Sequence, residues 1–579
     1  MFYNSPDSLE PSRVGQRWSA SQSASVLKEE QMAQEGAQRI TLRSIIIGVL
    51  GCIVLTAVSM YTALKLGALP WPIVFAAIIA LLFLRLCGSR DLHEANVAHT
   101  MMTAGSMVAG GLAFTIPGIL ILGAGDVTIW QMLLVALAGT LLGLGATMVF
   151  RRRFVDDEPM EYPIGEAAAQ TLIGADAGGK TAAAVFIPMA IAAIYAWIRD
   201  RMAKLPAVFF MKGQVPGVAF GLYNSPMMIA VGFLMGAVPM LVWFLGALIG
   251  DFGLVVGGSA AGWWTLETGQ AIKSSLGMGL MIGGGLAVVA KVFIDRLRKN
   301  AASDGASKAA SLTNFADGIA NPKVARIVVL AATVLAFLMC LALRLSVVTS
   351  LVIIVLVWVA AVMAIICVGH TGIDPMEVFG LIVMLLAAAL NEMPVMSMFF
   401  VAAVIAVACG LVGDVMNDFH AGHVLGTSPK NQYISQAAGA LIGAVVAALT
   451  MYLLLQAYGA DAFGVGKTFV ATQASTVALL VSGIPNVPAF IAGLVLGVGL
   501  YFVKVPTVML GLGVYLPFLM SLAAGLGGLI RFIFDMVVKN RSDEDKAKAN
   551  TTMVLVSSGI LGGESICGVI IAFLAIAGI

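Results

Sequence analysis

Charged residues are scarce in this sequence. Only 11% of its 579 residues are Asp, Glu, Lys or Arg, while 60% are apolar. Because an ordinary soluble protein is about a quarter charged, this composition excludes a soluble fold with a charged surface. The formal net charge of +2 also gives no basic footprint for nucleic acid. We therefore expect an integral membrane protein surrounded by lipid, with no nucleic-acid partner.

Signatures of redox chemistry, hydrolysis and ATP use are missing as well. The six cysteines form no CxxC pair, and we interpret them as buried thiols without a redox role. No GxSxG or HExxH motif occurs, and the GxxxxGK[ST] spacing occurs once, as GADAGGKT at 174–181. That stretch lies between two apolar segments and lacks the preceding strand of a P-loop, so an ATP-driven pump has no support. We predict no catalytic residue, no metal site and no cofactor. Residues 1–40 lack the apolar core of a cleavable signal peptide, and we expect a flexible cytoplasmic tail there.

Long apolar segments are abundant. A helix needs about 20 mostly apolar residues to cross the hydrocarbon core of a bilayer. Shorter apolar pieces at 376–390, 468–482 and 488–503 could cross at a steep angle, or dip in and return. We predict an all-α, polytopic membrane protein with about fourteen to sixteen transmembrane helices, some of them short or re-entrant. The clearest crossings are 43–66, 72–88, 100–122, 128–150, 181–198, 227–250, 274–293, 324–343, 346–368, 394–412, 432–455, 506–533 and 552–578.

The segment 294–322 is the longest polar interruption and is rich in Ala, Ser, Lys and Asp. We interpret it as a cytoplasmic linker between a first transmembrane half, 41–293, and a second, 323–579. Proline and glycine mark three further breaks inside apolar segments, at 110–118, 482–488 and 511–517. Broken helices can hold a substrate at the bilayer midplane.

Lys and Arg in the short loops indicate orientation, because cytoplasmic loops retain positive charge. The basic residues of the tail place the N-terminus in the cytoplasm, in a plasma membrane or, for a Gram-negative source, the inner membrane. Basic loops should therefore recur after every two crossings. This alternation fails between Arg151 and Arg199, where only one clear helix separates two basic clusters. We therefore predict that residues 162–174 re-enter the membrane against protein, beside a cavity.

Glu564 is the sharpest single candidate, because a carboxylate inside an apolar helix is costly. Its small neighbours Gly562, Gly563 and Ser565 predict room for water or substrate, and a desolvated acid suits proton coupling. The structural alternative is an ion pair, with Lys65 or Arg531 as partner.

Two other polar groups are candidates. Glu166, one helical turn from Gln170, either lines the cavity or lies in the first turn of a helix, where the dipole favours an acid. The segment 414–423 holds Asp, Asn and two His residues, and we interpret it as a polar cytoplasmic loop that closes over a pathway. A metal held by His420 and His423 is the alternative.

Several stretches resemble one family. Residues 418–436, DFHAGHVLGTSPKNQYISQ, are similar to the "DFKTG…SPK…SQ" stretch of the oligopeptide transporter superfamily, particularly its yellow stripe-like branch. The YPIG at 162–165 resembles the "YPxG" segment of that family. Further similarity at 41–67, 96–117, 513–531 and 563–568 follows the same order, especially that of prokaryotic members. The NPG and KIPPR signatures of eukaryotic peptide-transporting members are absent.

The resemblance implies a secondary transporter that imports small peptides or metal chelates, is coupled to protons and works by alternating access, rather than an enzyme. Glu564, with Glu166 second, is expected to carry the proton, and a carboxylate-bearing chelate would meet Lys65 or Arg531. The alternatives are a membrane-embedded metal-dependent hydrolase using 414–423, or a passive channel. A homodimer through an apolar face is possible. The residues expected to line or gate the pathway are Tyr162, Gln170, Asp418, Lys430, Gln436 and Tyr515.

Overall fold

The structure is a computed structural model, and part of the chain is described in it. The expected tail at 1–40 lies outside this part except for Ile40, and it stays a prediction. The described residues are 40–66, 73–157, 160–174, 179–209, 215–302, 316, 318–371, 374–464, 466–482 and 484–577.

The described chain is almost entirely helical. Eleven of its helices are long and apolar enough to cross a membrane, and four shorter apolar helices accompany them. The predicted class, an all-α polytopic membrane protein, is confirmed. The predicted short segments form α15, α18 and α19.

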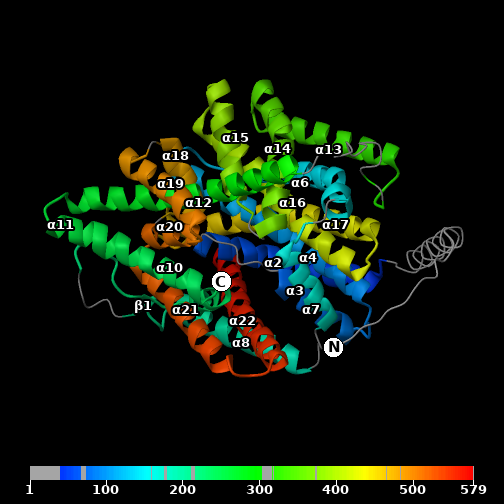
Figure 1. Ribbon diagram of the computed structural model, residues 1–579, viewed down its shortest axis with the longest axis horizontal. Coiled ribbons are helices and arrows are strands. Elements are labelled where there is room, and N and C mark those ends of the chain that lie inside the picture. Colours follow the sequence, from blue (N-terminus) through cyan, green and yellow to red (C-terminus); the bar gives the residue numbers. More distant parts are fainter. Residues whose placement is uncertain are drawn as a thin grey trace, which may run out of the picture.

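One group of helices, here called the first bundle, packs around α16 (Figure 1). It also contains the short elements α5 (Pro117–Ile121), η1 (Arg152–Asp157), η5 (Ala460–Ala462) and α18 (Thr472–Ser482). Its main helices are α2 (Leu42–Leu66), α3 (Ile73–Leu86), α4 (Leu92–Ala113), α6 (Ile129–Arg151), α7 (Pro163–Gly174), α13 (Pro322–Ala342), α14 (Val347–Thr371), α15 (Met376–Leu390), α16 (Val395–Leu425) and α17 (Pro429–Tyr458).

The second bundle consists of helices that pack around α12 and α22. A two-stranded hairpin joins it, in which β1 (Val208–Phe209) pairs antiparallel with β2 (Leu222–Tyr223). Its helices are α8 (Gly179–Ala196), η2 (Trp197–Arg201), α9 (Pro226–Met235), α10 (Ala237–Ala247), η3 (Leu248–Gly257), α11 (Gly258–Ala260), α12 (Leu266–Ala302), α19 (Val487–Phe502), α20 (Thr507–Tyr515), α21 (Phe518–Val538) and α22 (Asp543–Ile576).

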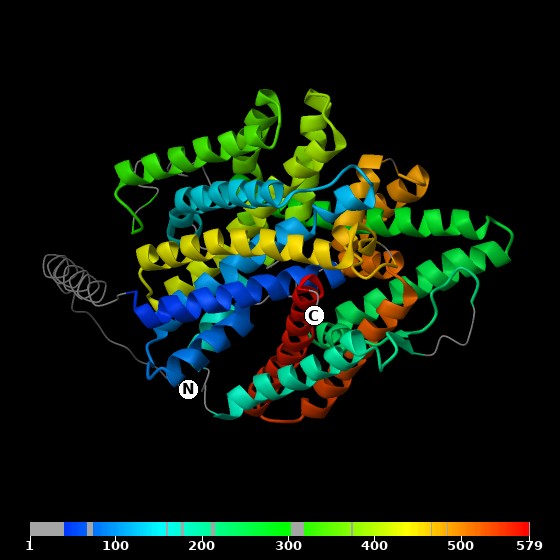
Figure 2. The ribbon, with the colours of Figure 1, turned by 180° about the vertical axis from the view of Figure 1, so that it is seen from behind.

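Each bundle draws helices from both predicted halves of the chain. In the first bundle, α16 and α17 pack on α4 and α6, and in the second α19 and α20 pack on α12. The bundles meet where α2 and α17 contact α22, and the view from behind shows the same arrangement (Figure 2). The predicted halves 41–293 and 323–579 therefore do not correspond to the two bundles. The helix α12 extends to Ala302, into the expected linker.

Gly and Pro interrupt several predicted crossings. The breaks predicted at 110–118, 482–488 and 511–517 are confirmed as the ends of α4, α18 and α20. The continuous crossing predicted at 227–250 is wrong, whereas the segment 506–533 contains the break predicted in it. Gly236, at φ 96°, separates α9 from α10, and Pro517 precedes α21. A φ in this range suits glycine because a Cβ would clash there.

The predicted polar loop at 414–423 is also wrong, because these residues form the last turns of α16. From Phe399 to Gly422 every residue except His420 is buried. A helix surrounded by protein needs no polar face, so its few polar residues lie inside the bundle. The segment predicted to re-enter is the short helix α7, which packs against α16 and α3. Its Gly165 N–H donates to Oδ1 of Asn417.

Candidate functional site

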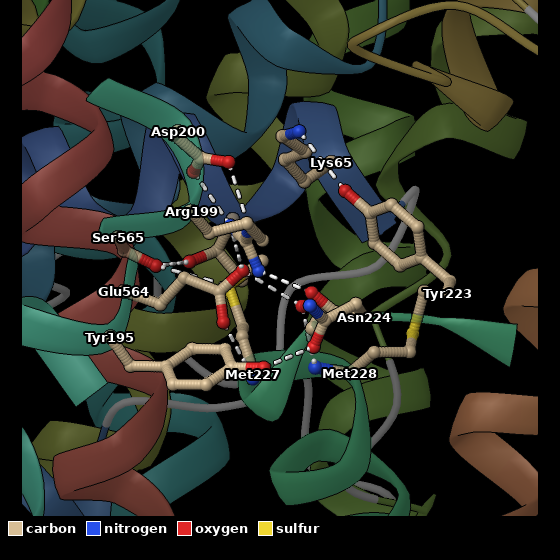
Figure 3. Close-up of polar contacts among 12 residues, drawn as sticks. Lys65, Tyr195, Arg199, Asp200, Tyr223, Asn224, Met227, Met228, Glu564 and Ser565 are labelled. Atoms are coloured by element: carbon tan, nitrogen blue, oxygen red, sulfur yellow. Dashed lines mark hydrogen bonds and ion pairs between the residues drawn. The ribbon is translucent and has the colours of Figure 1, made fainter. Parts of the chain in front are cut away.

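The carboxylate of Glu564 lies buried on α22 between three donors (Figure 3). Its Oε1 accepts hydrogen bonds from Nη2 of Arg199 at 2.9 Å and from Oγ of Ser225 at 2.8 Å. Its Oε2 accepts one from the backbone N–H of Met227 at 2.9 Å. The carboxylate thereby holds α22 to η2 and to the start of α9.

The local sequence explains the donors of α9. Ser225 is the N-cap and its Oγ accepts from the N–H of Met228, while Pro226 occupies the first turn. Ser is a preferred N-cap and Pro suits the first helical position, where no N–H is needed. The free N–H of Met227 and the helix dipole both favour an anion here, and Glu564 supplies it.

Arg199 lies in the π-helical turn η2 and is buried. Its Nε and Nη2 donate to the two carboxylate oxygens of Asp200 at 2.7 and 2.6 Å, and its Nη1 donates to the backbone oxygen of Asn224. The hydroxyl of Tyr195 donates to Oδ1 of Asn224 at 2.6 Å. One guanidinium is thus shared by two carboxylates, Asp200 and Glu564.

The ion-pair partners predicted from the sequence, Lys65 and Arg531, are both wrong. Arg531 pairs instead with Asp535 on its own helix at 3.0 Å, and its guanidinium lies over the ring of Phe233. The true partner, Arg199, had served as a cytoplasmic loop charge in the orientation argument. Because its side chain is buried, Arg199 does not mark a cytoplasmic loop.

The sequence predicted that the small residues beside the carboxylate leave room for water or substrate. In the structure they do not. A Cβ at Gly563 would collide with the backbone oxygen of Met189 on α8. Oγ of Ser565 lies 2.9 Å from Oγ1 of Thr62 on α2. These small side chains instead let α22 approach α8 and α2 closely.

Lys65 ends α2 at the boundary between the bundles. Its Nζ donates to the hydroxyl of Tyr223 on β2 at 3.2 Å and lies 5.6–5.9 Å from the ring centres of Tyr61, Tyr223 and Phe469. No carboxylate of the described chain lies within 4 Å of it. Cation–π contacts offset part of the cost of burying an ammonium, but a buried charge without a counter-ion is costly.

A cavity of about 330 Å³ borders this network. Tyr195, Tyr223, Asn224 and Ser225 line its polar side, and the rest is lined by Ser557 and by apolar residues of the hairpin, α9, α21 and α22. A larger cavity of about 470 Å³ between α10 and α21 has only apolar and glycine residues in its lining. The smaller cavity is the better candidate for a ligand because polar groups converge on it.

Tyr162, Glu166 and Gln170 belong to or precede α7. Tyr162 is buried at φ 38°, its hydroxyl has no hydrogen-bond partner, and its ring centre lies 5.3 Å from that of His420. Glu166 lies in the first turn of α7, as one of the two alternatives predicted, with Oε2 3.2 Å from Nε2 of His420. The side chain of Gln170 lies outside the described residues. The role of this group in a pathway stays a prediction.

The two imidazoles of α16 have separate partners. His420 contacts Glu166, and Nδ1 of His423 lies 3.3 Å from Oδ1 of Asp156 in η1. Within the described ranges, no three His, Cys, Asp or Glu side chains are arranged to hold a metal ion. The metal alternative for His420 and His423, and with it the hydrolase, therefore has no geometric support.

Asp418 and Gln436 meet in the core of the first bundle. Asp418 Oδ2 accepts a hydrogen bond from Oγ1 of Thr103 on α4 at 2.8 Å, and Nε2 of Gln436 donates to the backbone oxygen of Val415. Lys430 and Tyr515 lie elsewhere. Lys430 is exposed in the first turn of α17, whereas Tyr515 is buried at the end of α20.

Residues 39–575 match the model of the family described as OPT oligopeptide transporter protein. The chain belongs to this family. The predicted resemblance is thereby confirmed, and the matched residues include both bundles.

Individual relatives match over short stretches. A Haemophilus influenzae protein that carries the name of an oligopeptide transporter is 32% identical over 114 residues, which are 20% of this chain and 18% of that protein. The Arabidopsis thaliana metal-nicotianamine transporters YSL2 and YSL3 are each 44% identical over 59 residues, 9% of both chains. These alignments thus span less than a fifth of the relatives' length.

Sequence reasoning missed much of the site. Arg199 and Asp200 were visible only as charges beside an apolar segment, and Ser225 only as a residue before a proline. The N-cap pattern of Asn-Ser-Pro before an apolar run could have located the start of α9. That α9 begins beside Glu564, 339 residues away from Ser225, is a property of the packing.

Proposed function

We propose that this protein is a secondary active transporter that imports small peptides or metal chelates by alternating access, driven by protons. Family membership and the names of the relatives support transport. The relatives' names cover both substrate classes. We further propose that it lies in the plasma membrane with its N-terminus in the cytoplasm, as its basic segments suggest.

The observation that carries the proposal is the buried ammonium of Lys65. Three aromatic rings and the hydroxyl of Tyr223 surround it. Asp200 interacts with it at longer range, but no carboxylate of the described chain lies within 4 Å. Peptides end in a carboxylate, and chelators of transition metals commonly bear carboxylates. A carboxylate of the substrate would supply a counter-ion in direct contact with Lys65, which the described part of the chain does not.

The location of Lys65 supports alternating access. Lys65 belongs to α2 of the first bundle, while Tyr223, Arg199 and Glu564 belong to the second. A substrate held by Lys65 and the cavity at Asn224 would therefore contact both bundles. Movement of one bundle against the other would then open the site to one side at a time.

The test is uptake by purified protein in sealed liposomes. The probes are a radiolabelled tripeptide and nickel–nicotianamine, each with and without an inward proton gradient. We expect Lys65→Met to lower uptake about tenfold or more, since a hydrogen bond to a charged group contributes about 1.5–3 kcal/mol. Lys504→Met, at an exposed lysine, is the matched control and should leave uptake unchanged.

Three results would contradict the proposal. Uptake of neither probe by the wild type would remove the substrate classes named. Flux independent of the proton gradient would indicate a passive channel. Equal uptake by Lys65→Met and Lys504→Met would remove Lys65 from the substrate site.

A further inference from the structure

The C-terminal half of α16 contains buried carboxylates that the site above does not use. Asp414 and Asp418, one helical turn apart, are both fully buried. Neither oxygen of Asp414 has a hydrogen-bond donor. Asp418 accepts from Thr103, but its Oδ1 has no donor and lies 3.8 Å from Nε2 of His99. Buried polar atoms without partners are rare and call for an explanation.

His99 provides a second, independent sign of a missing ligand. Its imidazole on α4 is fully buried, and neither ring nitrogen makes a hydrogen bond of good geometry. Its Nε2 is directed at Asp418. Gln436 on α17 likewise has an unpartnered Oε1 in this cluster. Acceptors and a titratable base therefore converge on one place without the proton-bearing groups that would satisfy them.

The other titratable groups nearby are acids and thiols. Asp374, in the loop before α15, lies against Gly413, and both of its oxygens lack donors. Glu377 on α15 and the thiols of Cys367 and Cys409 lie close enough to Asp374 to interact with it electrostatically. In the described chain no Lys or Arg forms an ion pair with Asp374, Asp414 or Asp418.

The chemistry around Asp414 and Asp418 indicates which ligand could neutralise them. Neighbouring carboxylates in an apolar core cannot all be ionised, because each uncompensated charge is costly and like charges repel. A metal ion would need several converging ligands, and the described residues provide no such group. A proton needs only one carboxylate oxygen and neutralises it. Carboxylates and histidines buried in membrane helices commonly form proton relays.

We propose that Asp414 and Asp418 bind the coupling proton of the transport cycle, with His99 as the neighbouring proton-accepting group, in place of Glu564. This assignment rests on the proposed function. A proton from the outer side protonates one carboxylate and leaves it as H⁺ toward the inner side, so charge and atoms balance. Thr103 and His99 are on α4, which packs on α2, the helix that carries Lys65. The proton and substrate sites are thus joined through two packed helices.

One readout of the site does not depend on transport. Infrared difference spectra of the purified full-length protein between acidic and alkaline buffer report protonated carboxyl groups. We expect Asp414→Asn and Asp418→Asn each to remove part of the carboxyl band, and Asp461→Asn, at an exposed aspartate, to leave the titration of buried carboxyls unchanged. A band identical in the wild type and both Asn variants overturns the proposal, whatever the transport results.

The transport readout separates proton coupling from substrate binding. Exchange of substrate across liposomes without a gradient needs no net proton movement, so both Asn variants should retain it. Stimulation of uptake by a proton gradient should disappear in both. Full stimulation in both variants overturns the proposal. If the wild type transports no probe, the proposed function fails, and the infrared band alone then decides whether these carboxylates hold the proton.

Conservative variants guard against loss of folding. Asp414→Glu keeps a titratable group. Thr103→Val removes the hydroxyl that donates to Asp418 and to backbone oxygens of its own helix, while both carboxylates stay in place. Both should shift the pH at which gradient-driven uptake is half-maximal while leaving exchange intact. An unchanged pH profile in both variants counts against the assignment.

Discussion

Two kinds of buried carboxylate occur in this protein, and their surroundings give them different roles. Glu564 accepts three hydrogen bonds, one of them from a guanidinium and one from a helix N-terminus. Asp414 accepts none. Protonating Glu564 would remove the charge that Arg199 pairs with, so each transport cycle would have to break and reform the α22–η2 contact. Asp414 can gain a proton without breaking any such contact.

The Arg199–Glu564 pair should therefore be structural. We expect Arg199→Met and Glu564→Gln each to lower the unfolding midpoint in detergent strongly, since breaking a buried ion pair costs about 3–5 kcal/mol. The double variant should be less damaging than the sum of the two, because the only carboxylate it leaves without Arg199 is that of Asp200, whose side chain is 31% exposed. Differential scanning fluorimetry of the purified variants measures this.

Arg531→Met is the control for these stability measurements. Its partner Asp535 is half-exposed on the same helix, and exposed pairs contribute about 1 kcal/mol or less. Residual uptake by Glu564→Gln should still respond to the proton gradient. A Glu564→Gln protein that is as stable as the wild type, yet no longer responds to the gradient, would return the proton role to Glu564.

At the level of elements, glycines determine how closely the helices approach. On α22 a Cβ at Gly563 would meet the backbone oxygen of Met189, whereas the nearest atom to a Cβ at Gly562 is Cε of Met189 at 3.7 Å. We expect Gly563→Ala to lower the unfolding midpoint, with a cost of about 1–3 kcal/mol for overpacking. Gly562→Ala should be neutral or stabilising, because Ala favours a helix over Gly.

Adjacent positions make this a matched comparison. Both variants add one methyl group to the same helix, so a general effect of Ala would appear in both. Equal midpoints for the two variants would show that α8 can shift away from α22 without cost, and would contradict the close packing described here.

The elements themselves could largely be predicted from apolar length. The breaks at Pro117, Ser482 and Pro517 followed from local chemistry, as helix-disrupting residues act within one turn. The end of α16 could not be predicted in this way. Asp414, Asn417 and Asp418 have the composition of a loop, and only the surrounding helices α4, α7 and α17 allow such polar groups to continue a helix in the core.

Some residues of the candidate site could likewise be predicted from the sequence, and others could not. Glu564 and Lys65 could be found from the sequence, because a charge within an apolar helix is visible without a structure. Their partners could not. Arg199, Ser225 and Tyr223 come from a turn, a cap and a short strand, and nothing local indicates which helix each one faces.

At the level of the whole molecule, each bundle contains helices from both halves of the chain. The first bundle combines α2–α7 with α13–α18, and the second combines α8–α12 with α19–α22. Hydropathy reports each crossing but not its neighbours, so this arrangement was not visible in the sequence. It places Lys65, Thr62 and Tyr61 on one side of the boundary, facing α22 and the hairpin on the other.

If the bundles move against each other during transport, a covalent link across the boundary should stop it. Oγ1 of Thr62 and Oγ of Ser565 are 2.9 Å apart, so cysteines at both positions can meet at disulfide geometry. The exposed Cys87 is first replaced by Ser so that it cannot form other disulfides. In this background we expect the oxidised Thr62→Cys/Ser565→Cys protein to lose uptake in liposomes. Reduction should restore it.

A second cysteine pair distinguishes movement between bundles from general rigidity. Oγ1 of Thr100 and Oγ of Ser435 are 3.0 Å apart on α4 and α17, both in the first bundle. Because a rigid body does not change internally, the oxidised Thr100→Cys/Ser435→Cys protein should transport at the rate of its reduced form. Loss of uptake in this pair as well would mean that the first bundle deforms during the cycle. Full uptake in the oxidised Thr62→Cys/Ser565→Cys protein would mean that α2 and α22 move together, and the moving boundary would then have to lie elsewhere.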